Sequence, residues 1–283
     1  METQDLIYGI NGPVVTVRNS RSFSMMEMVF VGNERLVGEV IGVSDKVTTI
    51  QVYEETTGLR PGEPVYGTGS PMNVTLGPGL LDNIFDGIER PLKEIANQTG
   101  PFISRGSSVP PLDETREWDV TVMVKVGDQL KGGDLYAQCP ETPVVLHKCM
   151  VPPSLSGTVT KVVPDGKYHV NDTIVELTDT SGKVHALSLC QKWPIRTPRP
   201  VSQRLQPTVP LITGQRVIDT LFPISKGGTA AIPGGFGTGK TVLQHQLAKW
   251  CDADIIIYVG CGERGNEMSQ VLDEFSELVD PKS

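Results

Sequence analysis

A chain of 283 residues exceeds one ordinary hydrophobic core, so its length predicts two or three domains, and we expect three. Hydrophobic residues make up 38% and charged residues 20% of the chain, which is typical of a soluble globular protein. No apolar run approaches the roughly 20 residues that span a bilayer, which excludes a transmembrane chain. A formal charge of −8 without any run of Lys and Arg disfavours a nucleic-acid partner.

The N-terminal stretch METQDLIYGINGP has no basic region followed by an apolar core, so we expect no secretory or transit segment and a cytoplasmic location. The chain has five cysteines and no C-x-x-C pair. This favours reduced, packed thiols over a disulfide framework or a zinc site. The cysteines are Cys139, Cys149, Cys190, Cys251 and Cys261.

Residues 1–69 consist of short apolar runs that alternate with turn residues: PVVTV, EMVFVGNERLVGEVIGV and KVTTIQVY. Strands this short at this spacing predict a small antiparallel β-barrel. Residues 70–109 follow as a connector with two proline-glycine breaks, GSP and LGPG. Its apolar residues recur near helical spacing and predict a helix that Pro91 kinks or ends. They are Leu81, Phe85, Ile88, Leu92 and Ile95.

Residues 110–190 form a second all-β unit inserted into the chain. Apolar side chains alternate strictly from Trp118 to Val126, which predicts a strand with one buried face. The Gly-Asp turns of this unit resemble those of biotinyl and lipoyl carrier barrels, so Lys148 could be an attachment lysine in a hairpin turn. The biotin pattern needs Met before the lysine, where His147 stands, and this favours a solvated surface lysine instead.

Residues 191–283 begin with a proline-rich extended segment, which marks a domain boundary. Beyond it, the apolar runs 227–232 and 254–260 flank the stretch TVLQHQLAKW, in which Leu243, Leu247 and Trp250 make a helical stripe. Strand, helix and strand in about 30 residues indicate a βαβ crossover and hence a parallel sheet.

The stretch GGFGTGKT, from Gly234 to Thr241, fits the phosphate-loop pattern G-x-x-x-x-G-K-[ST] completely. Loop amides and the positive end of the following helix suit phosphate oxygens, and Lys240 adds a full charge. The Thr241 hydroxyl suits Mg²⁺. The predicted binding residues are Gly234, Gly235, Phe236, Gly237, Thr238, Gly239, Lys240, Thr241 and Val242.

The stretch VGCGERGNEM follows the second predicted strand, so we expect Glu263 and Arg264 on the same sheet edge as the phosphate loop. A carboxylate there can polarise an attacking water, and a guanidinium can meet charge that develops on a γ-phosphate. A surface salt bridge between the two residues, or a helix-capping role for Glu263, remains the alternative.

The four histidines, His147, His169, His185 and His245, lack metal-ligand spacing with a third partner, so we interpret them as surface or packing residues.

Five stretches together resemble the catalytic A subunit (alpha chain) of V-type and archaeal A-type rotary ATPases. They are PGGFGTGKT, GCGERGNEM, IQVYEETTGL, GPGLLDNIFDGIERPL and LITGQRVIDTLFP. The resemblance covers nearly the whole chain. The inserted β unit distinguishes this family from F-type β subunits, and the intact phosphate loop distinguishes it from the non-catalytic V-type B subunit.

The resemblance implies an N-terminal β-barrel, a peripheral all-β bulge and a RecA-like nucleotide domain that binds ATP or ADP with Mg²⁺. It implies a cytoplasmic head of alternating A and B subunits, three of each, which drives central and peripheral stalk subunits and moves ions through a separate membrane sector. It also implies that Lys240 grips phosphate, Glu263 activates water and Arg264 contacts the γ-phosphate.

The family continues for about as many residues again, so the resemblance implies an N-terminal fragment that hydrolyses ATP negligibly on its own. A truncated, non-catalytic nucleotide-binding or assembly module is the alternative. The residues leave open H⁺ or Na⁺ as the transported ion, and synthesis or hydrolysis as the direction.

Overall fold

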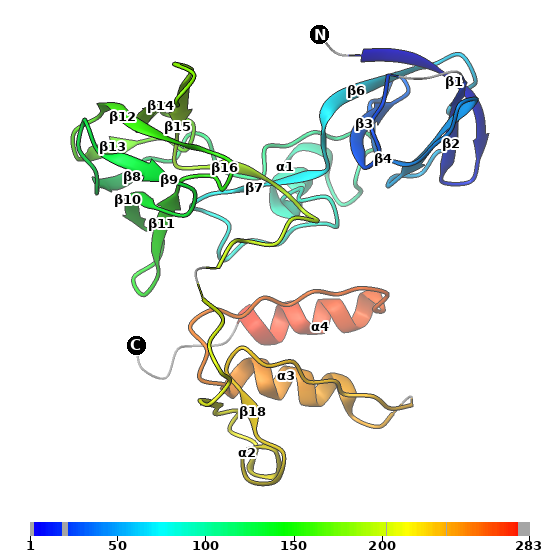
Figure 1. Cartoon of the computed structure of the whole chain (residues 1–283). Helices are drawn as coiled ribbons and strands as arrows, with labels where there is room; N and C mark the ends of the chain where they lie inside the picture. The colour runs from blue at the N-terminus through cyan, green and yellow to red at the C-terminus, as the bar shows by residue number, and fades with distance from the viewer. Residues whose placement is uncertain (1–2, 19–21, 202, 236, 277–283) are drawn as a thin grey trace. The chain divides into compact units, whose positions relative to one another are not determined.

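The computed structural model describes residues 3–18, 22–201, 203–235 and 237–276 (Figure 1). The chain divides into two compact units, Met1–Pro200 and Val201–Ser283. Within the described ranges, none of the helices has both the length and the apolar character that crossing a bilayer requires.

The first unit is almost entirely β-structure with one short helix. Its elements are β1 (Thr3–Asn11), β2 (Val14–Arg18), β3 (Glu27–Val31), β4 (Leu36–Val43), β5 (Val47–Val52), β6 (Pro64–Pro71), β7 (Asn73–Leu76), α1 (Leu92–Thr99), β8 (Trp118–Val122), β9 (Gln129–Lys131), β10 (Leu135–Pro140), β11 (Leu146–Met150), β12 (Ser156–Val162), β13 (Gly166–Tyr168), β14 (Val175–Thr178), β15 (Val184–Leu187) and β16 (Gln191–Pro194).

Strands β1 to β6 close into an antiparallel barrel in the order β1-β2-β5-β4-β3-β6, which confirms the predicted N-terminal barrel. Period-2 alternation explains its core, because every second side chain of a strand faces the same side. Val15 and Val17 of β2 and Val29 and Val31 of β3 are fully buried, whereas their neighbours along the strands are partly exposed. Closure pairs every strand on both sides, so the barrel has no free edge.

One carboxylate of the barrel wall is buried and paired with the chain beyond β16. Glu39, 1% exposed, accepts hydrogen bonds from Arg196 Nη2 at 2.7 Å and Nε at 3.1 Å. The Tyr53 hydroxyl also donates to Glu39, at 2.7 Å. The Arg196 hydrogen bonds hold the pKa of Glu39 below its usual value against the opposing effect of burial. This fork-like pair fixes residues 195–196 to the barrel.

The inserted all-β unit is a sandwich of two four-stranded sheets, ordered β11-β10-β8-β13 and β15-β14-β12-β9. Trp118 and Val120 of β8 and Leu177 of β14 lie in its core. Cys139 and Cys149 are buried there as free thiols, and burial raises the pKa of Cys149 to about 12. The predicted packing role of these two cysteines is confirmed.

The strand predicted from Trp118 to Val126 ends earlier, at Val122. The amide of Lys125 bonds the Asp128 carboxylate at 2.8 Å, which begins a turn at that point. The interpretation of Lys148 as a hairpin-turn residue is wrong, because Lys148 is an exposed residue inside β11, paired with Gln138 of β10.

The helix predicted to begin near Leu81 is wrong over residues 81–91, since α1 begins at Leu92 with Pro91 as its N-cap. The Asp86 carboxylate accepts the amides of Ile88 at 3.1 Å and Arg90 at 2.8 Å, which closes a turn instead. Side-chain bonds of this kind compete with helix, and proline removes a further amide.

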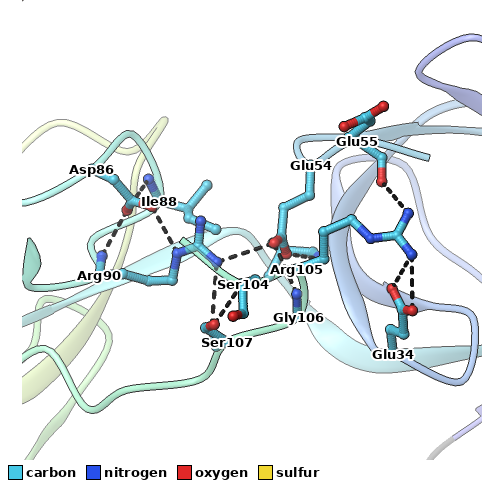
Figure 2. Close-up of polar contacts among 11 residues, drawn as sticks. Glu34, Glu54, Glu55, Asp86, Ile88, Arg90, Ser104, Arg105, Gly106 and Ser107 are labelled. Carbon is cyan, nitrogen blue, oxygen red and sulfur yellow. Dashed lines mark hydrogen bonds and ion pairs between the residues drawn. The ribbon is translucent and has the colours of Figure 1, made fainter. Parts of the chain in front are cut away.

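A polar network joins this turn to the barrel (Figure 2). Arg90 pairs with Asp86 at 2.7 Å and with Glu54 of the barrel at 3.1 Å. Glu54 also accepts the amide of Gly106 at 3.0 Å. The side chains of Arg90 and Glu54 are only 12% and 7% exposed, so this pair is largely shielded from water. Strand β7 in turn pairs with β16, which brings the two ends of the inserted unit together.

The second unit contains β17 (Pro210–Leu211), α2 (Arg216–Leu221), β18 (Ile224–Ser225), α3 (Lys240–Trp250) and α4 (Gly265–Ser276). The helix predicted before Trp250 is confirmed as α3. The structure assigns no strand to residues 227–232 or 254–260, so the predicted βαβ pair and parallel sheet are wrong for the described residues. A strand needs a hydrogen-bonded partner, and here Ile257 and Val259 are 82% and 76% exposed.

Candidate functional site

The glycine-rich loop is closed by its own lysine. The Lys240 ammonium donates to the carbonyl oxygen of Gly234 at 2.6 Å, and the Thr238 hydroxyl donates to the carbonyl of Gly235 at 2.9 Å. Both bonds draw the start of the loop toward the first turn of α3. The loop therefore encircles the position from which α3 begins, and places a cation there.

Two glycines of the loop adopt a backbone conformation that other residues rarely take. Gly237 has φ 74° and Gly239, the N-cap of α3, has φ 85°. An added Cβ at Gly235, Gly237 or Gly239 would meet no atom within 4 Å. Glycine is thus required at 237 and 239 for its left-handed conformation, and the side of the loop that bears these positions is open.

The remaining predicted binding residues differ in exposure. Thr241 is half-buried in the first turn of α3, and Val242 is 64% exposed. Phe236 lies outside the described residues. An open loop before a helix N-terminus, with a hydroxyl in the first turn, fits a phosphate chain with Mg²⁺ as a ligand set. Elsewhere in the described ranges, no cluster of three or more His, Cys, Asp or Glu could hold a metal ion.

The second predicted constellation also lies at a helix start. Glu263 and Arg264 are exposed and directly precede α4. The carbonyl oxygen of Arg264 accepts the amides of Glu267 at 3.0 Å and Met268 at 3.1 Å, which forms the first turn. The two loops thus share one design, a left-handed glycine (Gly239 or Gly262) followed within a few residues by a helix.

Helices α3 and α4 run side by side (Figure 1), joined by contacts that the sequence did not reveal. The predicted stripe of Leu243, Leu247 and Trp250 is not the buried face of α3, since Trp250 is 57% exposed. The buried residue is His245, 5% exposed, whose ring packs edge-on against Phe275 of α4. Its packing role was predicted, but no periodic signal marked it as the contact between the helices.

Tyr258 connects this contact to Glu263. Burial raises the pKa of the Tyr258 hydroxyl, and the negative charges of Glu263 and Glu267 raise it further. Those carboxylates are therefore close enough to act on the tyrosine. The other three histidines lie in the first unit, each facing a carboxylate: His147 with Glu141, His169 with Asp172 and His185 with Asp179.

Three regions of the chain match models of one protein family. Residues 7–69 match the beta-barrel domain of the ATP synthase alpha/beta family, residues 109–196 its barrel-sandwich domain and residues 214–280 its nucleotide-binding domain. The candidate phosphate loop and Glu263 both fall within the third region.

Relatives align along nearly the whole chain. The V-type ATP synthase alpha chain of Halothermothrix orenii is 58% identical over 100% of this chain and 48% of its own length. The V-type ATP synthase alpha chain 2 of Clostridium tetani is 55% identical over 98% of this chain and 47% of its own length. The A-type ATP synthase A subunit of Methanopyrus kandleri is 54% identical over 98% and 47%. The chain thus spans about half the length of these curated relatives.

A solved structure, the assembled ATPase EscN of the enteropathogenic E. coli type III secretion system, shares the fold. Its TM-score is 0.54 at 17% identity, over 99% of this chain and 46% of that one. With three domain models matched in order and relatives above half identity along its length, this chain belongs to the ATP synthase alpha/beta family and resembles the V-type alpha chains and A-type A subunits.

Proposed function

We propose that this chain carries the phosphate-binding part of the catalytic A subunit of a rotary V-type or A-type ATPase, which couples ATP hydrolysis or synthesis to H⁺ or Na⁺ transport. The observation that carries the proposal is the complete phosphate-loop pattern of Gly234 to Thr241, built on left-handed glycines and opening α3. The relatives support it, since they are V-type ATP synthase alpha chains and A-type ATP synthase A subunits by name.

In this proposal ATP or ADP binds at residues 234–242, with loop amides, the N-terminus of α3 and Lys240 meeting the phosphates. Lys240 already contacts the loop carbonyl of Gly234, so nucleotide phosphate replaces an internal hydrogen bond. The Thr241 hydroxyl is the proposed Mg²⁺ ligand. When bound, Mg²⁺ neutralises phosphate charge that develops during transfer.

Glu263 is the proposed water-activating carboxylate, and Arg264 is the proposed γ-phosphate contact. Both are exposed at the start of α4, where a carboxylate can accept a proton from water and a guanidinium can donate to phosphate oxygens. Lys240, Glu263 and Arg264 together would supply the cation, base and donor that phosphoanhydride hydrolysis needs. The chain alone is expected to turn over ATP negligibly, since the apolar residues 255–257 that lead to Tyr258 are exposed.

The proposed assembly is an alternating hexamer with a B subunit, attached to central and peripheral stalk subunits. It would lie in the cytoplasm, next to the membrane only through the ion-translocating sector. We propose the barrel at residues 1–69, the connector at 70–109, the bulge at 110–190 and the nucleotide unit from 191 onward.

A non-catalytic nucleotide-binding or assembly module is the second candidate. The outer face of the barrel favours it, because several apolar side chains there are close to half exposed, as subunit contacts require. They are Leu6 at 54%, Tyr8 at 49%, Ile41 at 40% and Val43 at 46%.

Mg-ATP turnover by the chain extended to the length of its relatives and assembled with its B partner separates the two functions. Glu263→Gln should keep nucleotide binding and lower turnover by at least about 10²-fold, the usual contribution of a general base. Asp254→Asn, at an exposed carboxylate of the same unit, is the matched control and should retain turnover. Unchanged turnover in Glu263→Gln would favour the assembly module.

A further inference from the structure

The inner face of α3 is occupied by one histidine. Of the 11 residues of this helix, all of them described, His245 alone is buried. Its Nε2 is shielded from solvent and has no hydrogen-bond partner among the described residues. An aliphatic side chain would fill this space without the cost of desolvating a nitrogen, so packing volume by itself does not account for an imidazole.

The imidazole belongs to a triangle of rings. Its centroid lies 5.8 Å from that of Tyr258 and 5.9 Å from that of Phe275, with interplanar angles of 68° and 67°. Tyr258 and Phe275 are themselves 5.8 Å apart at 89°. All three contacts have the edge-to-face geometry that aromatic quadrupoles favour. The triangle joins α3, α4 and the segment that leads from α3 to Glu263.

A carboxylate faces the same ring from α4. His245 Nδ1 lies 3.6 Å from an oxygen of Glu274, the oxygen that also accepts the ammonium of Lys249. Gln270 donates to the other oxygen at 2.7 Å. Lys249 first, and Gln270 second, hold the pKa of Glu274 below its usual value. The ring thus lies between two aromatic edges and an anionic group.

The cluster lies between the two loops along the chain. Lys240 and Thr241 precede His245 by five and four residues on the same helix, a rise of about 6–8 Å. Glu263 follows Tyr258 by five residues, and its charge is among the causes that raise the pKa of that tyrosine. A shift of α3 against the rings would therefore change the spacing between the phosphate loop and Glu263.

We propose that His245 is a positioning residue, whose ring holds the helix of the phosphate loop at a fixed spacing from Glu263. The proposal rests on the proposed function, and deepens it by naming a residue that touches neither nucleotide nor water. Lys240 and Thr241 keep their grip on phosphate through the loop itself. The carboxylate needs the ring triangle to meet the γ-phosphate at the correct distance.

Turnover and nucleotide affinity, measured in the assembled full-length protein, separate positioning from plain packing. His245→Ala should lower kcat about tenfold or more, because displacement of a reacting group by 1 Å can cost up to about 10²-fold. The Kd for ATP should change less than about twofold. His245→Phe keeps a ring and should recover most of kcat, whereas His245→Asn should behave like His245→Ala. His169→Ala, in the first unit, is the control and should resemble wild type.

The decisive comparison is a double-mutant cycle with Glu263→Gln. If His245 acts through Glu263, His245→Ala should cost nothing further in the Glu263→Gln background. Additive losses, or parallel losses in affinity and kcat, would overturn the positioning role. Wild-type turnover in Glu263→Gln would instead overturn the proposed function itself, so the two failures are distinguishable. Should His245→Ala not fold, the contrast between His245→Phe and His245→Asn decides the question.

Discussion

The barrel and the nucleotide unit both contain β-branched, apolar sequence but use it differently. In the barrel, Val15, Leu36 and Ile50 are fully buried inside a closed ring of strands. In the second unit, the run of Ile255, Ile256 and Ile257 is exposed and unpaired within the described residues. An apolar run therefore predicts burial only where partner strands complete its hydrogen bonds and cover its face.

The strongest destabilisation should come from breaking the shielded ion pair that secures the connector to the barrel. Arg90→Ala should lower the free energy of unfolding of the first unit by about 3–5 kcal/mol, because it leaves Glu54 and Asp86 buried without their cation. Lys161→Ala removes a pair whose lysine is 68% exposed and should cost less than about 1 kcal/mol. Urea unfolding followed by hydrogen exchange measures both. Equal costs would show that shielding does not matter.

A pair of isoleucine substitutions tests the contrast between the buried and the exposed apolar runs. Ile50→Ala, at 0% exposure, should cost about 2–5 kcal/mol through lost burial and a cavity. Ile257→Ala, at 82% exposure, should change stability by less than about 0.5 kcal/mol. Hydrogen exchange resolves the two units in one experiment. A large loss at Ile257 would mean that this run is covered in solution.

Two glycine substitutions compare a crowded left-handed position in the first unit with an open one in the second. An added Cβ at Gly106, φ 64°, would lie 2.1 Å from the carbonyl oxygen of Glu34, so Gly106→Ala should cost about 2–3 kcal/mol in strain and backbone shift. Gly239→Ala meets no neighbour and should cost only about 1–2 kcal/mol, from its φ of 85°. Thermal unfolding ranks the two. The reverse order would contradict the geometry of the loop.

The weakest effect concerns pH. Folding lowers the pKa of Glu39 through Arg196 and that of Glu274 through Lys249, so each carboxylate stabilises its unit above its usual pKa. That contribution is lost as pH falls through and below about 4.5, the unperturbed value. Glu39 is buried and Glu274 partly exposed, so Glu39→Gln should flatten the acid profile more than Glu274→Gln does. Equal profiles from acid titration of unfolding would contradict this ranking.

The sequence predicted the barrel and the phosphate-loop helix, because alternation and the Gly-Lys-Thr spacing are local signals. It failed at residues 81–91, where a side-chain acceptor, Asp86, captured amides that a helix would have used. It also failed at residues 254–260, where strand formation depends on partners beyond the segment. Both errors concern hydrogen-bond partners, which periodicity does not specify.

Within the candidate site, the residue types were readable and their supports were not. Lys240, Glu263 and Arg264 stand in recognisable patterns. The contact of His245 with Tyr258 and Phe275 joins positions 13 to 30 residues apart and depends on how two helices pack. No single-segment pattern marks such a contact, and the apolar stripe of α3 pointed to a different face.

Calorimetric titration of this chain with Mg-ATP would show whether residues 234–242 bind nucleotide phosphate, on which the proposed function depends. We expect measurable binding that Lys240→Ala weakens by at least about tenfold, since a charge-assisted phosphate contact contributes about 1.5–3 kcal/mol. Lys226→Ala, which removes an exposed lysine paired with Asp252 in the same unit, should leave the affinity unchanged. Equal affinity of wild type and Lys240→Ala for Mg-ATP would contradict phosphate binding by this loop.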